Sequence, residues 1–172
     1  MIELRPAVSA DAPALARVHV QSWAETYQGL MPDGFLSGMT SQTMQERRQT
    51  LWTQTLEEGQ DVVLVAVQGG EVVGFASGGP TDFAGYDAEL FTLYLLKSAQ
   101  GTGIGRALVR ELAQALGAAG HASLLLWVLN VNPTRGFYER LGGVLIGEKT
   151  VSVRGGELRE VAYGWADVGA LA

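Results

Sequence analysis

The sequence predicts an α/β domain in which a mixed, mostly antiparallel sheet of six to seven strands is flanked by four helices. Glycine-rich turns at 69–70 and 154–156 each separate two apolar runs, which predicts two antiparallel hairpins. Between the hairpins, the apolar run 88–96 leads through a helical pattern to a second apolar run at 122–129. A strand, a helix and a strand in this order predict one parallel crossover in the middle of the sheet. The length of 172 residues fits a single domain, residues 1–172.

The chain before the first hairpin supplies one strand and two helices. Residues 2–5 are expected to form a short strand that ends at Pro6, and Ser9 is expected to cap a helix over 11–27. A loop is expected at 29–34. A second helix should cover Gln42 to Glu58 and stop at a glycine, with its inward side chains given by Met44, Leu51, Leu56.

The remaining elements follow from the period of their apolar residues. From Gly103, apolar residues recur every four positions, which predicts an amphipathic helix ended by Gly117 and Gly120. A short helix is expected to open at Pro133 and to end near Leu141. The other expected segments are strands at 61–67 and 71–77, a polar loop at 78–87, and closing strands at 144–153 and 157–165.

Composition argues against several classes of protein. The formal net charge of −6 is unfavourable for general nucleic-acid binding, which rests on Lys and Arg against phosphates. The longest wholly apolar run, Leu124 to Leu129, is far shorter than the ~18 residues of a membrane span. With no cysteine, neither disulfides nor a thiolate metal site is expected, and no metal is assigned. No export signal opens the sequence, so we expect a cytoplasmic protein with neither a nucleic-acid nor a membrane partner.

Three glycines stand between the apolar run 88–96 and the following helix, in Gln100-Gly101-Thr102-Gly103-Ile104-Gly105. A nucleotide P-loop is excluded because the chain has no Gly-Lys pair. A dinucleotide fingerprint is excluded because Arg106 or Leu108 stands where its third glycine is needed. On the residues alone, a flexible turn without a ligand stays open beside an anion site built on bare N–H groups.

Two motifs together carry a resemblance to a known family. The stretch from Gln100 matches Q-x-x-G-x-G, and Asn132-Pro133 precedes a helix that carries Phe137-Tyr138 and then Gly142. This chain resembles the GNAT-superfamily N-acetyltransferases. The motifs cover residues 88–143, and the order of the predicted strands and helices extends the resemblance over nearly the whole chain.

The resemblance implies acetyl-CoA as the cosubstrate. In the family the two central parallel strands splay apart, and the backbone of Leu93 and Leu95 would hold the pantetheine arm between them and polarise the thioester carbonyl. Asn132, or in its place Asn130, would hydrogen-bond this arm, and Tyr138 would also contact the cofactor. The pyrophosphate would be bound by Gln100, Gly101, Thr102, Gly103, Ile104, Gly105, Arg106.

For catalysis the resemblance implies direct attack by a primary amine of a small molecule or a protein, within a ternary complex. Tyr138 would protonate the leaving thiolate, although it can equally be an aromatic packed beside Phe137. Glu89 at the start of a central strand would act as the base, often through water, or else faces solvent. The base is left open between Glu89, Glu25 and water.

The end of the first helix and the loop after it line the acceptor pocket in this family. The resemblance therefore assigns Trp23, Glu25 and Tyr27 to the acceptor, with ordinary core packing as the alternative for the two aromatics. His19 on the same helix is expected to be a structural hydrogen-bonding residue. The alternative function is a non-catalytic acyl-CoA-binding or regulatory domain, and a homodimer through the C-terminal hairpin stays open.

Overall fold

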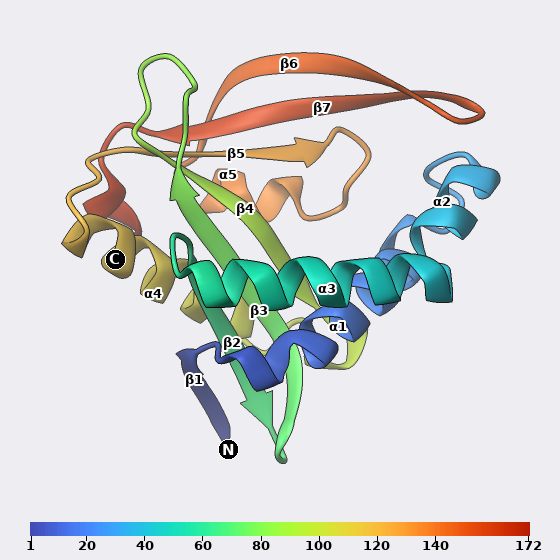
Figure 1. Ribbon diagram of the computed structural model, residues 1–172. Helices are drawn as coiled ribbons and strands as arrows, with labels where there is room; N and C mark the ends of the chain where they lie inside the picture. Colours follow the sequence, from blue (N-terminus) through green and yellow to red (C-terminus); the bar gives the residue numbers. More distant parts are fainter.

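A computed structural model describes residues 1–172 and confirms the predicted fold class (Figure 1). Its seven strands form one sheet in the order β1-β2-β3-β4-β5-β7-β6. All neighbouring strands are antiparallel except β4 and β5, which form the one parallel pair. The strands are β1 Ile2–Pro6, β2 Val62–Gln68, β3 Glu71–Pro80, β4 Ala88–Leu95, β5 Leu124–Leu129, β6 Val144–Val153 and β7 Gly156–Trp165.

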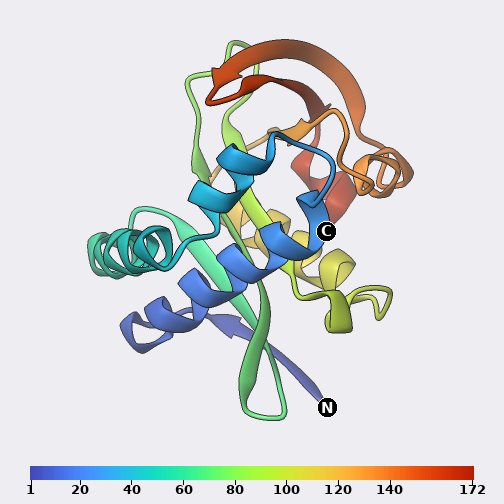
Figure 2. The same ribbon diagram turned by 90° about the vertical axis from the view of Figure 1, so that its right-hand side faces the viewer.

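Helices cover both faces of the sheet (Figures 1 and 2). Helices α1 and α3 pack against each other on one face, and α4 packs on the other face across β2, β3 and β4. None of the helices combines the length and the apolar character that a membrane crossing needs. The α-helices are α1 Ala12–Tyr27, α2 Asp33–Met39, α3 Gln42–Glu58, α4 Ile104–Ala118 and α5 Arg135–Arg140, with short 3-10 helices η1 Ser9–Asp11, η2 Lys97–Ala99 and η3 Val168–Leu171.

The strand β2 shows why its sequence is a continuous apolar run. Val63 and Val65 belong to the core under α1 and α3, while Leu64 and Ala66 belong to the larger core under α4. Side chains alternate across a strand, so a strand covered by helices on both faces must be apolar at every position.

The parallel pair β4–β5 opens after three residue pairs. Ala88 to Leu90 pair with Leu124 to Leu126, and no later residue of β4 pairs with β5. At Phe91 the pairing of β4 with β3 shifts by one residue, which marks a β-bulge. Figure 1 shows the two strands separating beyond this point. The edge of β4 from Phe91 to Leu95 that faces β5 is therefore free of a strand partner.

Helix α2 corrects the sequence-based count of four helices and part of the expected loop at 29–34. It begins directly after Pro32, whose carbonyl accepts the N–H of Leu36 at 3.0 Å. Two glycines, Gly34 and Gly38, interrupt the helical pattern in the sequence. The burial of Leu36, which is 8% exposed, compensates for the weak intrinsic helix preference of this segment.

Ser9 does not cap α1 as predicted, because it opens the turn η1 instead. Asp11 caps this turn, with its Oδ2 accepting the N–H of Val8 at 2.8 Å, and no side chain caps α1 itself. The Arg5 guanidinium donates to both oxygens of this carboxylate at 2.7 and 3.0 Å. Asp11 thus joins β1 to the start of α1.

Two further expectations about helix faces and ends are wrong. Leu51 is 61% exposed, because the inward side of α3 runs one position later, through Arg48, Trp52 and Leu56. Gly117 lies inside α4, and the chain turns instead at Gly120, which has a φ of 96°. The predicted stop of α3 at Gly59 is confirmed by its left-handed φ of 63°.

Candidate active site

Two cavities meet where β4 and β5 separate. The first, about 280 Å³, lies between the end of β4, the loop after it and α5. The second, about 230 Å³, lies between α1, α2 and the strands β4 to β7. Five residues line both cavities and therefore form the passage between them: Tyr27, Leu93, Tyr94, Asn132, Tyr138.

The loop between β4 and α4 leaves a run of backbone donors without protein acceptors. Gly101 and Gly103 have φ values of 73° and 86°, a region that favours glycine. The Thr102 hydroxyl donates to the carbonyl of Ala99 at 2.6 Å, which tightens the turn. No protein group accepts the N–H groups of residues 101–106 at the start of α4. Free N–H groups and a helix N-terminus together make a site suited to an anion.

Arginines extend this anion site beyond the loop. A third cavity, about 660 Å³, is lined by Gly103, Arg106, Arg110 and Arg140, and Arg140 also lines the first cavity. The predicted residue Arg106 therefore lies beside the loop on the α4 side. Ile104 is only 3% exposed and belongs to the core, so its N–H alone is available to a ligand.

The other predicted cofactor residues line the first cavity. Leu93 and Leu95 stand on the free edge of β4, and Gln100 donates from Nε2 to the carbonyl of Leu95 at 3.2 Å. Gly105 also lines this cavity, but its φ is not positive. A methyl group at Gly105 would make ordinary contacts with the surrounding side chains at 3.7 and 3.8 Å.

Tyr138 lies on α5 at the passage between the cavities and is 6% exposed. Burial raises the pKa of its phenol above the ordinary value, so the group is protonated at neutral pH. Hydrogen bonds hold α5 on β7: the Tyr163 hydroxyl donates to Glu139 at 2.6 Å, and Trp165 Nε1 donates to the carbonyl of Leu141 at 2.9 Å. These bonds fix where the Tyr138 hydroxyl stands.

Asn132 connects α5 to α1. Its Nδ2 donates to the Tyr27 hydroxyl at 2.8 Å, and its Oδ1 accepts from the N–H and hydroxyl of Thr134 at 2.8 and 2.7 Å. The side chain thus caps the turn that begins α5 and lines both cavities. The other candidate, Asn130, lines neither, and its carbonyl accepts from Arg135 at 3.2 Å.

Comparison with known proteins identifies the family. The model of the acetyltransferase (GNAT) family matches residues 22–143, which is more than half of the chain. N-acetyltransferase YuaI of Bacillus subtilis, itself uncharacterized, is 34% identical over 99% of this chain and 96% of its own. This chain belongs to the GNAT family. The predictions of a GNAT-superfamily protein and of an N-acetyltransferase enzyme are confirmed.

Solved structures support the fold of this GNAT acetyltransferase. PaiA N-acetyltransferase from Thermoplasma acidophilum, in complex with coenzyme A, has a TM-score of 0.69 at 21% identity and covers 94% of this chain and 98% of its own. A ribosomal-protein-alanine N-acetyltransferase from Brucella melitensis has a TM-score of 0.71 at 26% identity, with 95% and 98% covered.

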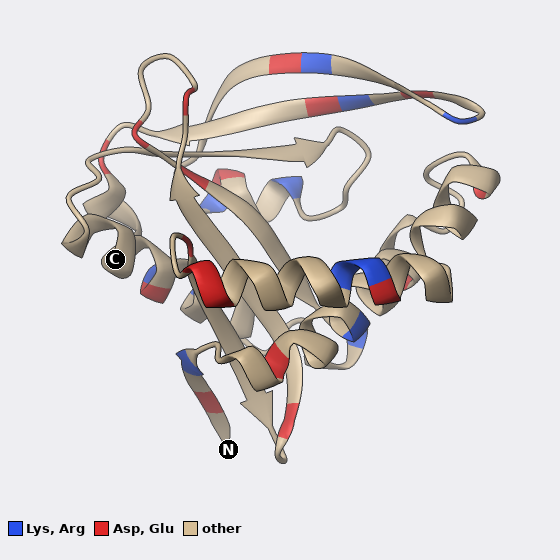
Figure 3. Cartoon of the chain, viewed as in Figure 1, with Lys and Arg blue, Asp and Glu red and all other residues tan.

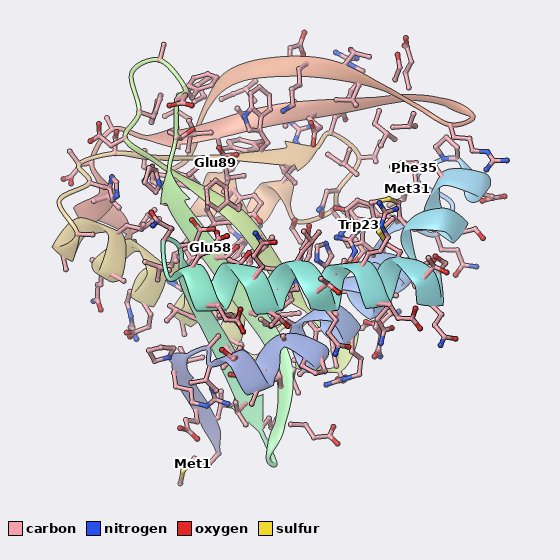
Figure 4. All side chains as sticks on the ribbon, in the orientation of Figure 1. Met1, Trp23, Met31, Phe35, Glu58 and Glu89 are labelled. Atoms are coloured by element: carbon pink, nitrogen blue, oxygen red, sulfur yellow. The ribbon has the colours of Figure 1, made fainter.

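Glu89 lies on β4 where the strand still pairs with β5, opposite Leu125. It is half-buried, and burial raises the pKa of its carboxyl, while a hydrogen bond of 3.2 Å from the Thr81 hydroxyl opposes this. Glu89 lines neither cavity of this acetyltransferase. Figure 4 shows it on β4, apart from Trp23, Met31 and Phe35 at the junction of α1 and α2.

Of the three predicted acceptor residues, the structure brings two to the second cavity. Trp23 and Tyr27 line it, with their rings edge to face at 5.1 Å between centroids. Glu25 does not line it. Its Oε2 accepts the N–H of Lys97 at 2.7 Å, so it ties α1 to the chain that follows β4.

His19 belongs to a buried cluster below the second cavity. It is 7% exposed, stacks on Tyr94 at 4.4 Å between ring centroids, and has Arg48 Nη1 2.8 Å from its Nε2. Burial, with the neighbouring arginine, lowers the pKa of His19 to about 3, so the ring is neutral at physiological pH. The expectation of a structural hydrogen-bonding histidine agrees with this placement.

Sequence reasoning missed most of the second cavity. Phe35 comes from α2, Phe91 from the bulge of β4, and Trp127 from β5. The closing hairpin adds four more residues, Val151, Val153, Leu158, Glu160. Their period-two spacing within 144–153 and 157–165 was visible and places each pair on one face of its strand. Glu160 is the one acidic residue among these positions, and this is the feature of the sequence that could have indicated a site there.

Proposed function

We propose that this GNAT acetyltransferase transfers an acetyl group from acetyl-CoA to a primary amine by direct attack within a ternary complex. The observation that carries the proposal is the opening between β4 and β5, which lies between an anion site at one end and a cavity with aromatic and aliphatic walls at the other. An extended thioester ligand fits such an opening, because its amides can pair with the free edge of β4.

Each part of the ligand has a chemically matched surface. Phosphates would lie against the N–H groups of residues 101–106 and the guanidinium groups of Arg106, Arg110 and Arg140. The pantetheine arm would lie along Leu93 and Leu95. A coenzyme A complex of the PaiA enzyme, with the same fold, supports this assignment.

The reaction then takes place at the passage between the two cavities. The lone pair of the amine attacks the thioester carbonyl carbon, and backbone N–H groups on the free edge of β4 stabilise the developing negative oxygen. As the C–S bond breaks, the buried phenol of Tyr138 gives its proton to the leaving sulfur. The ammonium nitrogen loses two protons in all: the first leaves before the attack, through water to Glu89, whose raised pKa suits this role, and the second restores the Tyr138 phenol through water. The products are the N-acetylated amine and free CoA.

The test begins with binding and then removes one proton donor. Calorimetry should show micromolar binding of acetyl-CoA and none of ATP, and Gly103→Glu should abolish it by placing a carboxylate at the anion site. With an amine acceptor, Tyr138→Phe should lower kcat about 100-fold or more at an unchanged Kd for acetyl-CoA. Tyr86→Phe is the matched control, because Tyr86 packs against Gly164 outside both cavities.

Full turnover in Tyr138→Phe would overturn the role of this residue. Tight acetyl-CoA binding with no acetyl transfer to any class of amine would instead favour the alternative, a non-catalytic acyl-CoA-binding domain.

We propose that the enzyme works in the cytoplasm. A homodimer is proposed through β6, which is an edge strand with Val144 and Leu145 64% and 57% exposed. Light scattering should give twice the mass of one chain, and Leu145→Lys should return the protein to a monomer.

A further inference from the structure

The second cavity is lined mostly by aliphatic and aromatic side chains. Apart from the hydroxyls of three tyrosines and the indole N–H groups of Trp23 and Trp127, the polar side chains of its lining are Asn132 and Glu160. Asn132 already uses its amide on Tyr27 and Thr134. Glu160 is therefore the one charged group that the cavity offers to an acceptor.

Aromatic side chains form much of the cavity wall. Trp23 and Tyr27 stand edge to face on the α1 side, and Trp127 stands on the sheet side. Phe35 and Phe91 complete the wall. Such surfaces favour a flat apolar body, since a hydroxyl-rich body would lose its hydrogen bonds to water without replacement.

Glu160 is positioned to receive an ammonium group. It lies on β7 opposite Leu129, and one of its oxygens, Oε2, is 3.3 Å from Lys149 Nζ. The other oxygen has no protein donor. Lys149 Nζ itself lies 4.1 Å from the centroid of the Trp127 ring, and this cation–π contact holds the ammonium group of the lysine against the sheet. Figure 3 shows the adjoining acidic and basic positions on β6 and β7.

The cavity is also small. Its volume of about 230 Å³ is below the ~300–1,000 Å³ of pockets for drug-sized ligands. At the tip of the β6–β7 hairpin, Gly155 and Gly156 approach Pro32 of the α1–α2 connection so closely that an added Cβ would lie 3.3 and 3.4 Å from its ring. A single ring with a short aminoalkyl chain fits this space.

We propose that the acceptor is a small monoamine with an aromatic or similarly apolar body, whose ammonium group is first bound by Glu160. This inference rests on the proposed acetyl transfer and adds the class of acceptor. Polyamines fit the cavity less well, because Glu160 is the one charged residue of its lining and pairs with a single ammonium group, and amino sugars would lose hydrogen bonds to water against the aromatic walls.

The experiment compares acceptors at saturating acetyl-CoA by the rate of CoA release. We expect kcat/KM for 2-phenylethylamine to exceed that for glucosamine, a polar amine of similar size, by at least tenfold. Spermidine and a peptide with an N-terminal alanine complete the panel. The peptide represents the acceptor named for the Brucella melitensis enzyme. Preference for glucosamine, spermidine or the peptide would overturn the inference, as would silence of all amines while acetyl-CoA binds.

Variants test the carboxylate separately. Glu160→Gln should raise the KM for 2-phenylethylamine about tenfold and leave the Kd for acetyl-CoA unchanged. Glu157→Gln, on the same strand but exposed, is the matched control. Lys149→Met removes the partner of Glu160 but keeps the carboxylate, so it should not raise this KM. An unchanged KM in Glu160→Gln overturns the ammonium site. Failure of acetyl-CoA to bind contradicts the proposed function itself, and calorimetry detects that without an acceptor.

Discussion

Asn132 and Tyr27, 105 residues apart in the sequence, are joined by a hydrogen bond of 2.8 Å from Nδ2 to the phenol oxygen. The bond connects the start of α5 to the end of α1 across the passage between the two cavities. Oδ1 accepts both bonds from Thr134, and the second N–H of Nδ2 stays free of a protein acceptor.

Removing the Asn132 side chain should therefore destabilise the protein more than removing the Tyr27 hydroxyl. Asn132→Ala loses both the bond to Tyr27 and the cap on Thr134, and should lower the free energy of unfolding by about 1–2 kcal/mol. Tyr27→Phe loses only the first and should cost about 1 kcal/mol or less. Urea unfolding of both variants measures this, and equal losses would contradict the capping role.

Alanine should have opposite effects at two glycines of the same loop. Gly103→Ala places a side chain at a φ of 86° and should cost about 1–2 kcal/mol of unfolding free energy. Gly105→Ala lies in the first turn of α4 with only ordinary contacts, and should stabilise the protein by about 0.5–1 kcal/mol. The midpoints of thermal unfolding of the two variants, compared with that of the parent protein, measure both effects. Destabilisation by Gly105→Ala would contradict the expectation that the added methyl group makes only ordinary contacts.

Glu89 should govern the acidic side of the pH–rate profile. Because burial raises its pKa, the carboxyl stays protonated to a higher pH than an ordinary glutamate, and kcat/KM should rise as it ionises. Glu89→Gln should remove this rise and lower the plateau at least tenfold. Glu25→Gln, which alters a carboxylate bound to Lys97 N–H, should keep the rise. A rise that persists in Glu89→Gln would assign the proton to water alone.

His19 should make stability fall in acid. Its pKa is lowered to about 3 in the folded protein, against an ordinary value of 6.5. Below pH 6.5 the unfolded chain therefore binds a proton that the folded chain excludes, and the free energy of unfolding should fall by about 1.4 kcal/mol per pH unit from this source. The stabilisation is present above pH 6.5 and is lost as the pH falls toward 3.

The measurement is urea unfolding at pH 7, 6 and 5 for the parent protein and His19→Gln. The slope that disappears in the variant isolates this histidine from the carboxylates that also titrate in acid. His121→Gln, at the other histidine in the turn after α4, should keep the parent slope. Identical slopes in the parent and His19→Gln would show that His19 is protonated in the fold.

The fold and several residues that line the first cavity could be predicted because their signals in the sequence are local. Gly101 and Gly103 are needed for their own backbone angles, and the passage residue Tyr138 sits in a contiguous motif beside Phe137. The continuous apolar run of β2 follows from burial of both faces of the strand. The apolar residues that recur about every four positions in α4 follow from burial of one face of the helix.

Most of the lining of the second cavity could not be predicted because it is assembled from distant elements. Phe35, Trp127 and Glu160 come from three segments whose meeting depends on how α2 and the β6–β7 hairpin close over the sheet. Glu25 looked equivalent to Trp23 and Tyr27 in sequence, yet it faces the chain after β4. The local sequence pattern predicts which side chains share one face of a helix, but it does not predict which elements that face contacts.

The three residue pairs that join β4 to β5 divide the sheet into two half-sheets, β1 to β4 and β5 to β7, with a hinge at 88–90. Beyond residue 90 the two half-sheets share no backbone hydrogen bonds, so an extended ligand that lies between them would connect them. Amides of β4 from 91 to 95 should then exchange hydrogen for deuterium more slowly when acetyl-CoA is bound, while those of β2 stay unchanged. Bound in the proposed position, the cosubstrate would also be a temporary part of the scaffold.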